Sequence, residues 1–190
     1  MGDIKVNTVK TDTLTNVAGT QTLANPAEVN SIIETWYYDD GDTVHANNDI
    51  LNQGFTRLTT NQFANKNGGM THSTAAGTTG DGIWTFPSTG VYDIFLNMKY
   101  YNSTGASDNS GVILQITTNN SAYSDIDGAY GNDRGASAHN QIILHNVLNI
   151  TDVSNQKIKF KCSTGNNITI QGSNDAFGTK IRFIKLCASV

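Results

Sequence analysis

The sequence predicts an all-β domain in which antiparallel strands form a sandwich or barrel, and three observations lead to this prediction. Only 15% of the 190 residues are charged, and the many Thr, Asn, Ser and Gly residues are typical of β-rich chains with frequent turns. Eight to ten alternating or β-branched segments follow one another, each bounded by turn residues. No segment of helical length separates them, which disfavours a parallel α/β sheet.

Residues 1–25 differ from the rest of the chain because they contain many threonines and no aromatic residue. Their sparse apolar side chains cannot offset the entropy lost on ordering. A disordered tail would fit this composition, and so would an extended arm that is ordered by pairing with another chain. We favour an extended N-terminal anchoring arm, whose predicted anchoring side chains are Ile4, Val6, Val9 and Leu14.

Residues 26–53 are predicted to connect this arm to the head. The segment 26–36 is the best helix candidate, because Pro26 suits a first helical turn and the next apolar residues recur at helical spacing. A strand or an irregular conformation there remains open. The polar segment 37–49 is expected to be a loop.

The predicted head spans residues 54–190 and holds the strands. They are expected at 54–63, 69–74, 82–86, 91–101, 111–119, 122–126, 140–151, 156–162, 167–172 and 178–186.

The segment DGIWTFPSTGVYDIFLNMKYY, residues 81–101, concentrates the aromatic side chains around a single proline. Pro87 cannot donate a hydrogen bond to a neighbouring strand, so it ends the strand at 82–86. The chain then turns and returns as a long strand. Alternate residues of that strand form an unbroken apolar row, which we predict to face the core: Tyr92, Ile94, Leu96, Met98 and Tyr100.

The sequence offers little catalytic chemistry. Its four histidines form no HxxxH or HxH pair, and GxSxG and a lysine-bearing phosphate loop are both missing. We therefore expect no enzymatic activity and no cofactor. His145 lies in an apolar segment and is expected to be a core or interface histidine. The net charge of −4 without a basic cluster argues against nucleic-acid binding, and no apolar run is long enough for membrane insertion.

Two further residue groups have weak alternative interpretations. Asp125, Asp127 and Asp133 are weak candidates for a calcium site, and turn residues are the simpler interpretation. Cys162 alternates with lysines in KIKFKC and is expected to point into the core. Cys162 and Cys187 are expected to be two buried free thiols rather than a disulfide.

The segment FPSTGVY, followed by an apolar strand, resembles the complement globular-head family, which shares a trimeric jelly roll with tumour necrosis factor. Phe86, Pro87, Gly90 and Tyr92 carry this likeness. The closing segment IRFIKL lies where that family has its terminal apolar strand. The chain departs from some members of the family because it has no clear set of calcium ligands.

Over residues 34–187 the chain resembles more closely the small virion structural proteins of marine tailed phages. The likeness rests on the order of Trp36, GGMTHS, GIWTFPSTGVY, QITTNNSAYS and NITDVSNQKIKF. It implies a homotrimeric jelly roll on the surface of a bacteriophage virion, made in the host cytoplasm and held to capsid or tail proteins. A tail fibre or appendage and a capsid decoration both remain open.

The alternative function is a receptor- or glycan-binding tip of a tail fibre. Such a tip would present exposed aromatic and acidic side chains in its loops to a host-surface glycan or receptor. The candidates for a receptor loop are Tyr123, Tyr130 and Asp133.

Overall fold

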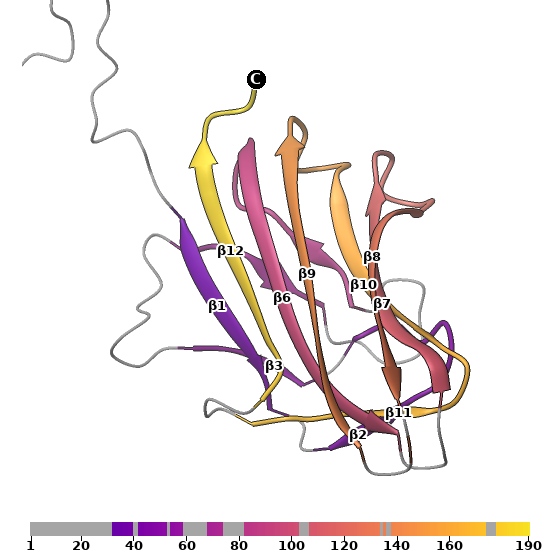
Figure 1. Ribbon diagram of the computed structural model, residues 1–190. Helices are drawn as coiled ribbons and strands as arrows, with labels where there is room; N and C mark the ends of the chain where they lie inside the picture. The colour runs from indigo at the N-terminus through magenta and orange to yellow at the C-terminus, as the bar shows by residue number, and fades with distance from the viewer. Residues whose placement is uncertain are drawn as a thin grey trace, which may run out of the picture. The chain divides into compact units, whose positions relative to one another are not determined.

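A computed structural model (Figure 1) describes residues 32–39, 42–52, 54–58, 68–73, 82–102, 107–133, 135, 138–173 and 178–190. Within these residues the backbone forms twelve strands and no helix. The strands are β1 (Ile33–Tyr38), β2 (Thr43–His45), β3 (Phe55–Arg57), β4 (Thr71–His72), β5 (Trp84–Thr85), β6 (Gly90–Asn102), β7 (Ser107–Thr117), β8 (Ser124–Asp133), β9 (His139–Ile150), β10 (Lys157–Thr164), β11 (Ile168–Ile170) and β12 (Lys180–Cys187).

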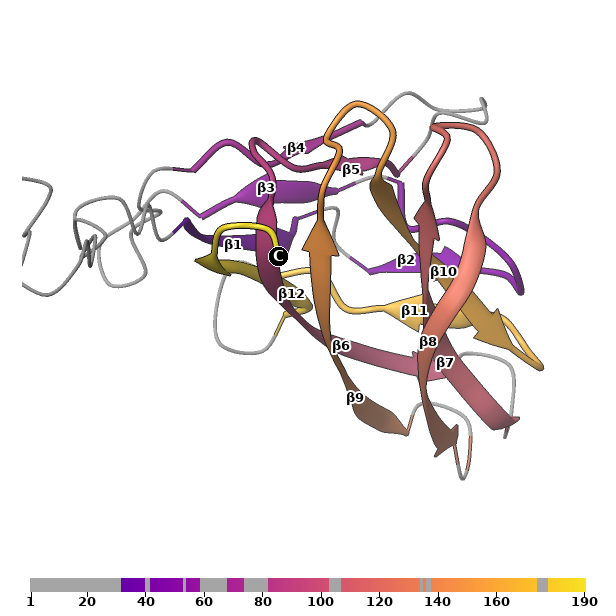
Figure 2. The ribbon, with the colours of Figure 1, turned by 90° about the horizontal axis from the view of Figure 1, so that it is seen from above.

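The strands form two antiparallel sheets, which confirms the predicted all-β sandwich. The first sheet has the order β2-β11-β6-β12-β1-β3, and β9 pairs with the other side of β6. The second sheet has the order β4-β5-β10-β7-β8. Figure 2 shows the sandwich from above. Because β9 and β8 each pair with one partner only, they are edge strands among the described residues.

The core lies between the two sheets. The side chains of the predicted apolar row of β6 are all fully buried, which confirms their assignment to the core: Tyr92, Ile94, Leu96, Met98 and Tyr100. Strand β7 contributes Val112 and Leu114 from the opposite sheet, and β10 contributes Phe160 and Cys162. The alternation along β6 therefore places one apolar side chain of every two between the sheets.

The aromatic residues around Pro87 close one part of this core. The ring centroid of Phe86 lies 4.7 Å from that of Tyr92, and that of Trp84 lies 5.1 Å from that of Phe183 on β12. The Tyr92 hydroxyl donates a 2.8 Å hydrogen bond to the carbonyl oxygen of Ser88. This hydrogen bond stabilises the turn at 87–89 against the strand that follows it.

The helix predicted at 26–36 is wrong from Ile33 onward, because Ile33–Tyr38 forms β1, which pairs with β12 and β3. The inward positions of β1 are alternate residues, and one of them is a buried glutamate, Glu34. This charged residue masked the period of two in the sequence. The predicted head boundary at residue 54 also changes, because β1 and β2 belong to the seven-stranded sheet.

The predicted anchoring side chains of the arm lie outside the described residues, as do residues 26–31. The four side chains concerned are Ile4, Val6, Val9 and Leu14. Their role therefore stays a prediction.

Candidate functional site

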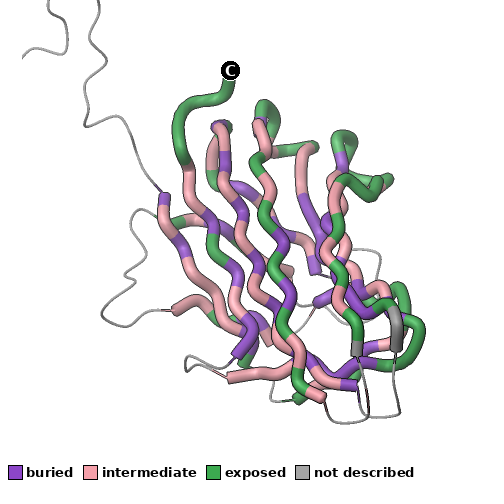
Figure 3. The backbone as a smooth tube through the Cα atoms, in the orientation of Figure 1, coloured by how far each residue is buried: buried purple, intermediate pink, exposed green. Residues whose placement is uncertain are grey.

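The outward side of the seven-stranded sheet, which we call the front face, is the first candidate surface. It is formed by β9, β6, β12 and β1, which lie side by side toward the viewer in Figure 1. Exposed and buried residues alternate along β9 in Figure 3. Ile143 and Val147, two of its outward residues, are each 52% exposed. Large apolar side chains with that much exposure commonly mark a contact surface when they lie together.

The strand register arranges the front face in three rows that run across the four strands. The first row consists of Val147, Asp93, Ile184 and Ile33. The second row consists of His145, Phe95, Arg182 and Thr35. The third row consists of Ile143, Asn97, Lys180 and Tyr37. Each row thus contains apolar side chains beside polar or charged ones.

Several charges of the front face are partnered within it. His145 Nε2 and Asp93 Oδ1 lie 2.7 Å apart. The Arg182 guanidinium lies over the Phe95 ring, 5.3 Å from its centroid, which is a cation–π arrangement. His145 was predicted to be a core or interface histidine. It is not a core residue, because its side chain is 57% exposed.

A shallow hollow of about 200 Å³ lies in the front face between Leu58, Phe95, Lys180 and Arg182. The side-chain oxygen Oδ1 of Asn97 is buried at this hollow and has no hydrogen-bond partner among the described residues. A buried amide oxygen without a donor is unfavourable.

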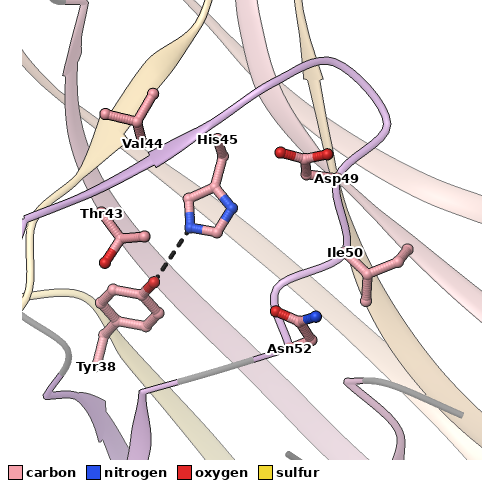
Figure 4. Close-up of a pocket in the computed structure, with 7 residues that line it drawn as sticks. All are labelled: Tyr38, Thr43, Val44, His45, Asp49, Ile50 and Asn52. Carbon is pink, nitrogen blue, oxygen red and sulfur yellow. Dashed lines mark hydrogen bonds between the residues drawn. The ribbon is translucent and has the colours of Figure 1, made fainter. Parts of the chain in front are cut away.

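A second hollow, of about 300 Å³, lies where β1 approaches β2 (Figure 4). The Tyr38 hydroxyl oxygen and His45 Nε2 are 3.1 Å apart and join these two strands. The Asp49 carboxylate accepts a 2.7 Å hydrogen bond from the backbone amide of Ala46 and so closes the turn after β2. These contacts stabilise one end of the sandwich.

The outward side of β10, β7 and β8, which we call the back face, contains the predicted receptor residues. They do not form one loop. Tyr123 precedes β8 and is half-buried, with Lys159 Nζ 4.4 Å from its ring centroid, and burial raises the pKa of Tyr123. Tyr130 lies within β8 and is 52% exposed. Asp133 ends β8, and its side chain is not described. The strand thus separates Tyr123 from Tyr130 by about 20 Å.

The weak calcium candidates on β8 point to different partners. Asp125 accepts hydrogen bonds from Gln115 and Lys161, and these bonds lower the pKa of Asp125. Asp127 accepts a 3.0 Å hydrogen bond from Asn146 on β9. The described residues contain no group of three or more His, Cys, Asp or Glu side chains placed to hold a metal ion.

Both cysteines are free. Cys162 is buried as predicted, and burial raises its pKa. Cys187 is exposed, so the expectation that both thiols are buried is wrong for this residue. It lies beyond the last inward position of β12, where the pairing with β6 becomes irregular. Across the described part of the chain, no helix is long and apolar enough to cross a membrane.

Comparison with known proteins identifies the fold. No family model and no curated protein matches the chain. Among solved structures, Eiger TNF from S. frugiperda has a TM-score of 0.62 at 12% identity, covering 84% of this chain and 95% of its own. Murine APRIL at pH 5.0 has a TM-score of 0.55 at 12% identity, covering 82% and 99%. The chain has the antiparallel jelly-roll fold of the tumour necrosis factor proteins.

Proposed function

We propose that this chain is a non-enzymatic structural subunit of a bacteriophage virion, which assembles as a homotrimer and is anchored by its N-terminal arm. The observation that carries the proposal is the front face, a sheet surface on which Ile143 and Val147 of the edge strand β9 are exposed. A second copy of the chain is the occupant that we assign to this face.

Association through the front face would remove apolar surface from water, which stabilises a complex by about 25 cal/mol for each Å² of apolar surface buried. The apolar side chains of the front face lie on adjacent strands. Ile143 and Val147 are on β9, and Phe95 on β6 and Ile184 on β12 lie between them and β1. Burial of charge would oppose association, because unpaired buried charges are unfavourable. The pairing of His145 with Asp93, and of Arg182 with Phe95, reduces that opposition.

The virion context is supported by the resemblance to tailed-phage structural proteins, which spans residues 34–187. The described core runs from Ile32 to Phe183. In the proposal, the N-terminal arm binds a capsid or tail protein, and the trimeric head is displayed at the virion surface.

The test is light scattering of the purified full chain. We expect about three times the chain mass of 20.4 kDa. Ile143→Lys and Val147→Lys together should give a monomer, because they place two cations in the proposed contact. Ile126→Lys is the matched control: Ile126 lies on β8 in the other sheet and is 40% exposed. A monomeric wild-type protein at micromolar concentration, or equal behaviour of the two variants, contradicts the proposed assembly.

A further inference from the structure

The Tyr130 ring rests on a glycine surface of the back face. Tyr130 pairs with Gly111 across β7 and β8, and Gly128 precedes it by two residues on the same side. A Cβ atom on Gly111 would lie 2.6 Å from Tyr130 Cδ1, and one on Gly128 would lie 3.1 Å from Tyr130 Cε2. Opposite corners of the ring therefore lie over two residues without side chains.

This arrangement leaves one face of an aromatic ring open to solvent. Gly111 is buried although it lies on the outward side of β7, because the Tyr130 side chain lies against it. Tyr130 itself is 52% exposed. The backbone fixes the underside of the ring, so a ligand that stacks on the upper side meets a surface that is already in place.

A polar group lies beside this ring on the same face. Gln115 Nε2 donates a 2.7 Å hydrogen bond to Asp125 Oδ1, and Lys161 Nζ lies 3.0 Å from Asp125 Oδ2. Ile113 lies between the two groups: it pairs with Gly128 on one side and with Lys161 on the other. The Asp125 side chain is 51% exposed, so its oxygens keep room for further donors.

The charges of Asp125 and Lys161 indicate which kind of ligand this surface would bind. Lys161 and Asp125 neutralise each other, so the surface beside Tyr130 presents hydrogen-bonding groups without a net charge. Two further lysines share the outward side of β10, but Lys159 is 7% exposed with its Nζ 4.4 Å from the Tyr123 ring, and Lys157 lies four residues beyond Lys161 along the strand. Lys161 is therefore the β10 lysine beside Tyr130, and its charge is matched by Asp125. The apolar parts near the ring are the half-buried Ile113 and, on β8, Ile126, which is 40% exposed. A protein partner would therefore meet only a small apolar surface here.

We propose that this surface binds a neutral pyranose ring of a glycan. The C–H groups on one side of a pyranose carry partial positive charge and would stack on the electron-rich face of Tyr130. The hydroxyl groups at the ring edge would donate to Asp125 and accept from Gln115 and Lys161. The open, flat surface suits a terminal or internal sugar of a longer chain.

This inference goes beyond the proposed trimer and does not depend on it. The back face belongs to the five-stranded sheet, whereas the proposed association uses the outward side of the seven-stranded sheet. Self-association through the front face would leave Tyr130 accessible. A trimer would then present three copies of the sugar site, which raises the apparent affinity for a glycan with many equivalent sugars.

The test is saturation-transfer-difference NMR on the full chain. The probes are the methyl pyranosides of β-glucose, β-galactose, α-mannose and β-N-acetylglucosamine. We expect at least one glycoside to receive saturation at its ring C–H protons. Tyr130→Ala should weaken binding about tenfold by removing the stacking surface. Tyr130→Phe, which keeps the ring, should bind within about twofold of the wild type.

Val44→Ala is the control, because Val44 is an exposed residue on β2 of the other sheet and lies outside the three rows of the front face; it should bind as the wild type does. Gln115→Ala tests the polar group without changing the ring and should weaken binding several-fold; it decides the matter if Tyr130→Ala does not fold. The inference is overturned if no glycoside receives saturation from the wild type, or if a folded Tyr130→Ala binds normally. Light scattering on the same samples reports the trimer separately, so failure of one proposal is distinguishable from failure of the other.

Discussion

The indole nitrogen of Trp36 donates a 3.0 Å hydrogen bond to the carboxylate of Glu34, two residues earlier on β1. Glu34 is fully buried, and its other oxygen accepts hydrogen bonds from the backbone amides of Gly69 and Met70. Arg57 on β3 lies 3.5 Å from the same oxygen. One buried carboxylate thus connects the first strand of the head to β3 and to the segment before β4.

We predict that Glu34→Ala lowers the free energy of unfolding by about 3–5 kcal/mol, because it leaves the backbone amides of Gly69 and Met70 and the Trp36 indole without their acceptor. Urea unfolding at several protein concentrations would measure this change. Asp39→Ala is the control, because Asp39 is an exposed carboxylate just after β1; it should change stability by less than about 0.5 kcal/mol. Similar effects of the two substitutions would show that Glu34 contributes no specific stability.

The core row of β6 gives a second prediction. Leu96 is fully buried at its centre, so Leu96→Ala should cost about 2–5 kcal/mol by leaving a cavity. Chemical unfolding would measure the loss, with the partly exposed Ile126→Ala as the comparison. A loss below about half a kilocalorie per mole at Leu96 would be incompatible with close packing at this position.

The degree to which the sequence predicts this fold depends on which residues occupy the inward positions. The row from Tyr92 to Tyr100 was predicted correctly because every inward residue is large and apolar. Strand β1 was missed because Glu34 takes an inward position, and the backbone donors that satisfy its carboxylate are brought to it only by the tertiary fold. The alternation of β1 becomes visible in the sequence only when an inward position is allowed to hold a polar residue.

The position of Tyr130 within a strand was missed for a related reason. The predicted strand at 122–126 stops where glycines begin, yet β8 continues to Asp133. Glycine is unfavourable in strands, so Tyr130 was assigned to a loop. Its glycine neighbours are instead the residues that let its ring lie on the sheet. Pairing of Gly111 with Tyr130 links positions 19 residues apart, and no local pattern in the sequence reveals that pairing.

The half-buried His72 predicts acid sensitivity. His72 stacks against Trp84 with ring centroids 4.3 Å apart, and burial lowers the pKa of His72 from 6.5 to about 4. The unfolded chain therefore binds more protons than the folded chain between these two values. Stability contributed by neutral His72 is present above about pH 6.5 and is lost as the pH falls toward about 4, by no more than about 3 kcal/mol.

Unfolding free energies measured from pH 7 to pH 4 would check this sign. His72→Phe should flatten the part of the pH dependence that His72 causes, because it keeps an aromatic ring against Trp84 without a titrating group. His139→Gln is the control, since His139 is exposed at the start of β9 and lies outside the three rows of the front face. An unchanged slope in His72→Phe would mean that other groups cause the acid loss.

The last prediction concerns the N-terminal arm, which lies outside the described residues. The first strand of the head begins at Ile33, and the described core starts at Ile32. Deletion of residues 2–25 should therefore leave a folded head with the oligomeric state of the full chain, as circular dichroism and light scattering would report. In a phage that carries the truncated gene, the protein should be lost from purified virions.

A narrower variant replaces Ile4, Val6, Val9 and Leu14 with Ser, and it should lower virion occupancy as the deletion does. Serines at Thr8, Thr11 and Thr13 are the control and should not lower it. If the truncated protein still occupies virions at the normal level, the arm is not the anchor, and the attachment surface must lie on the head.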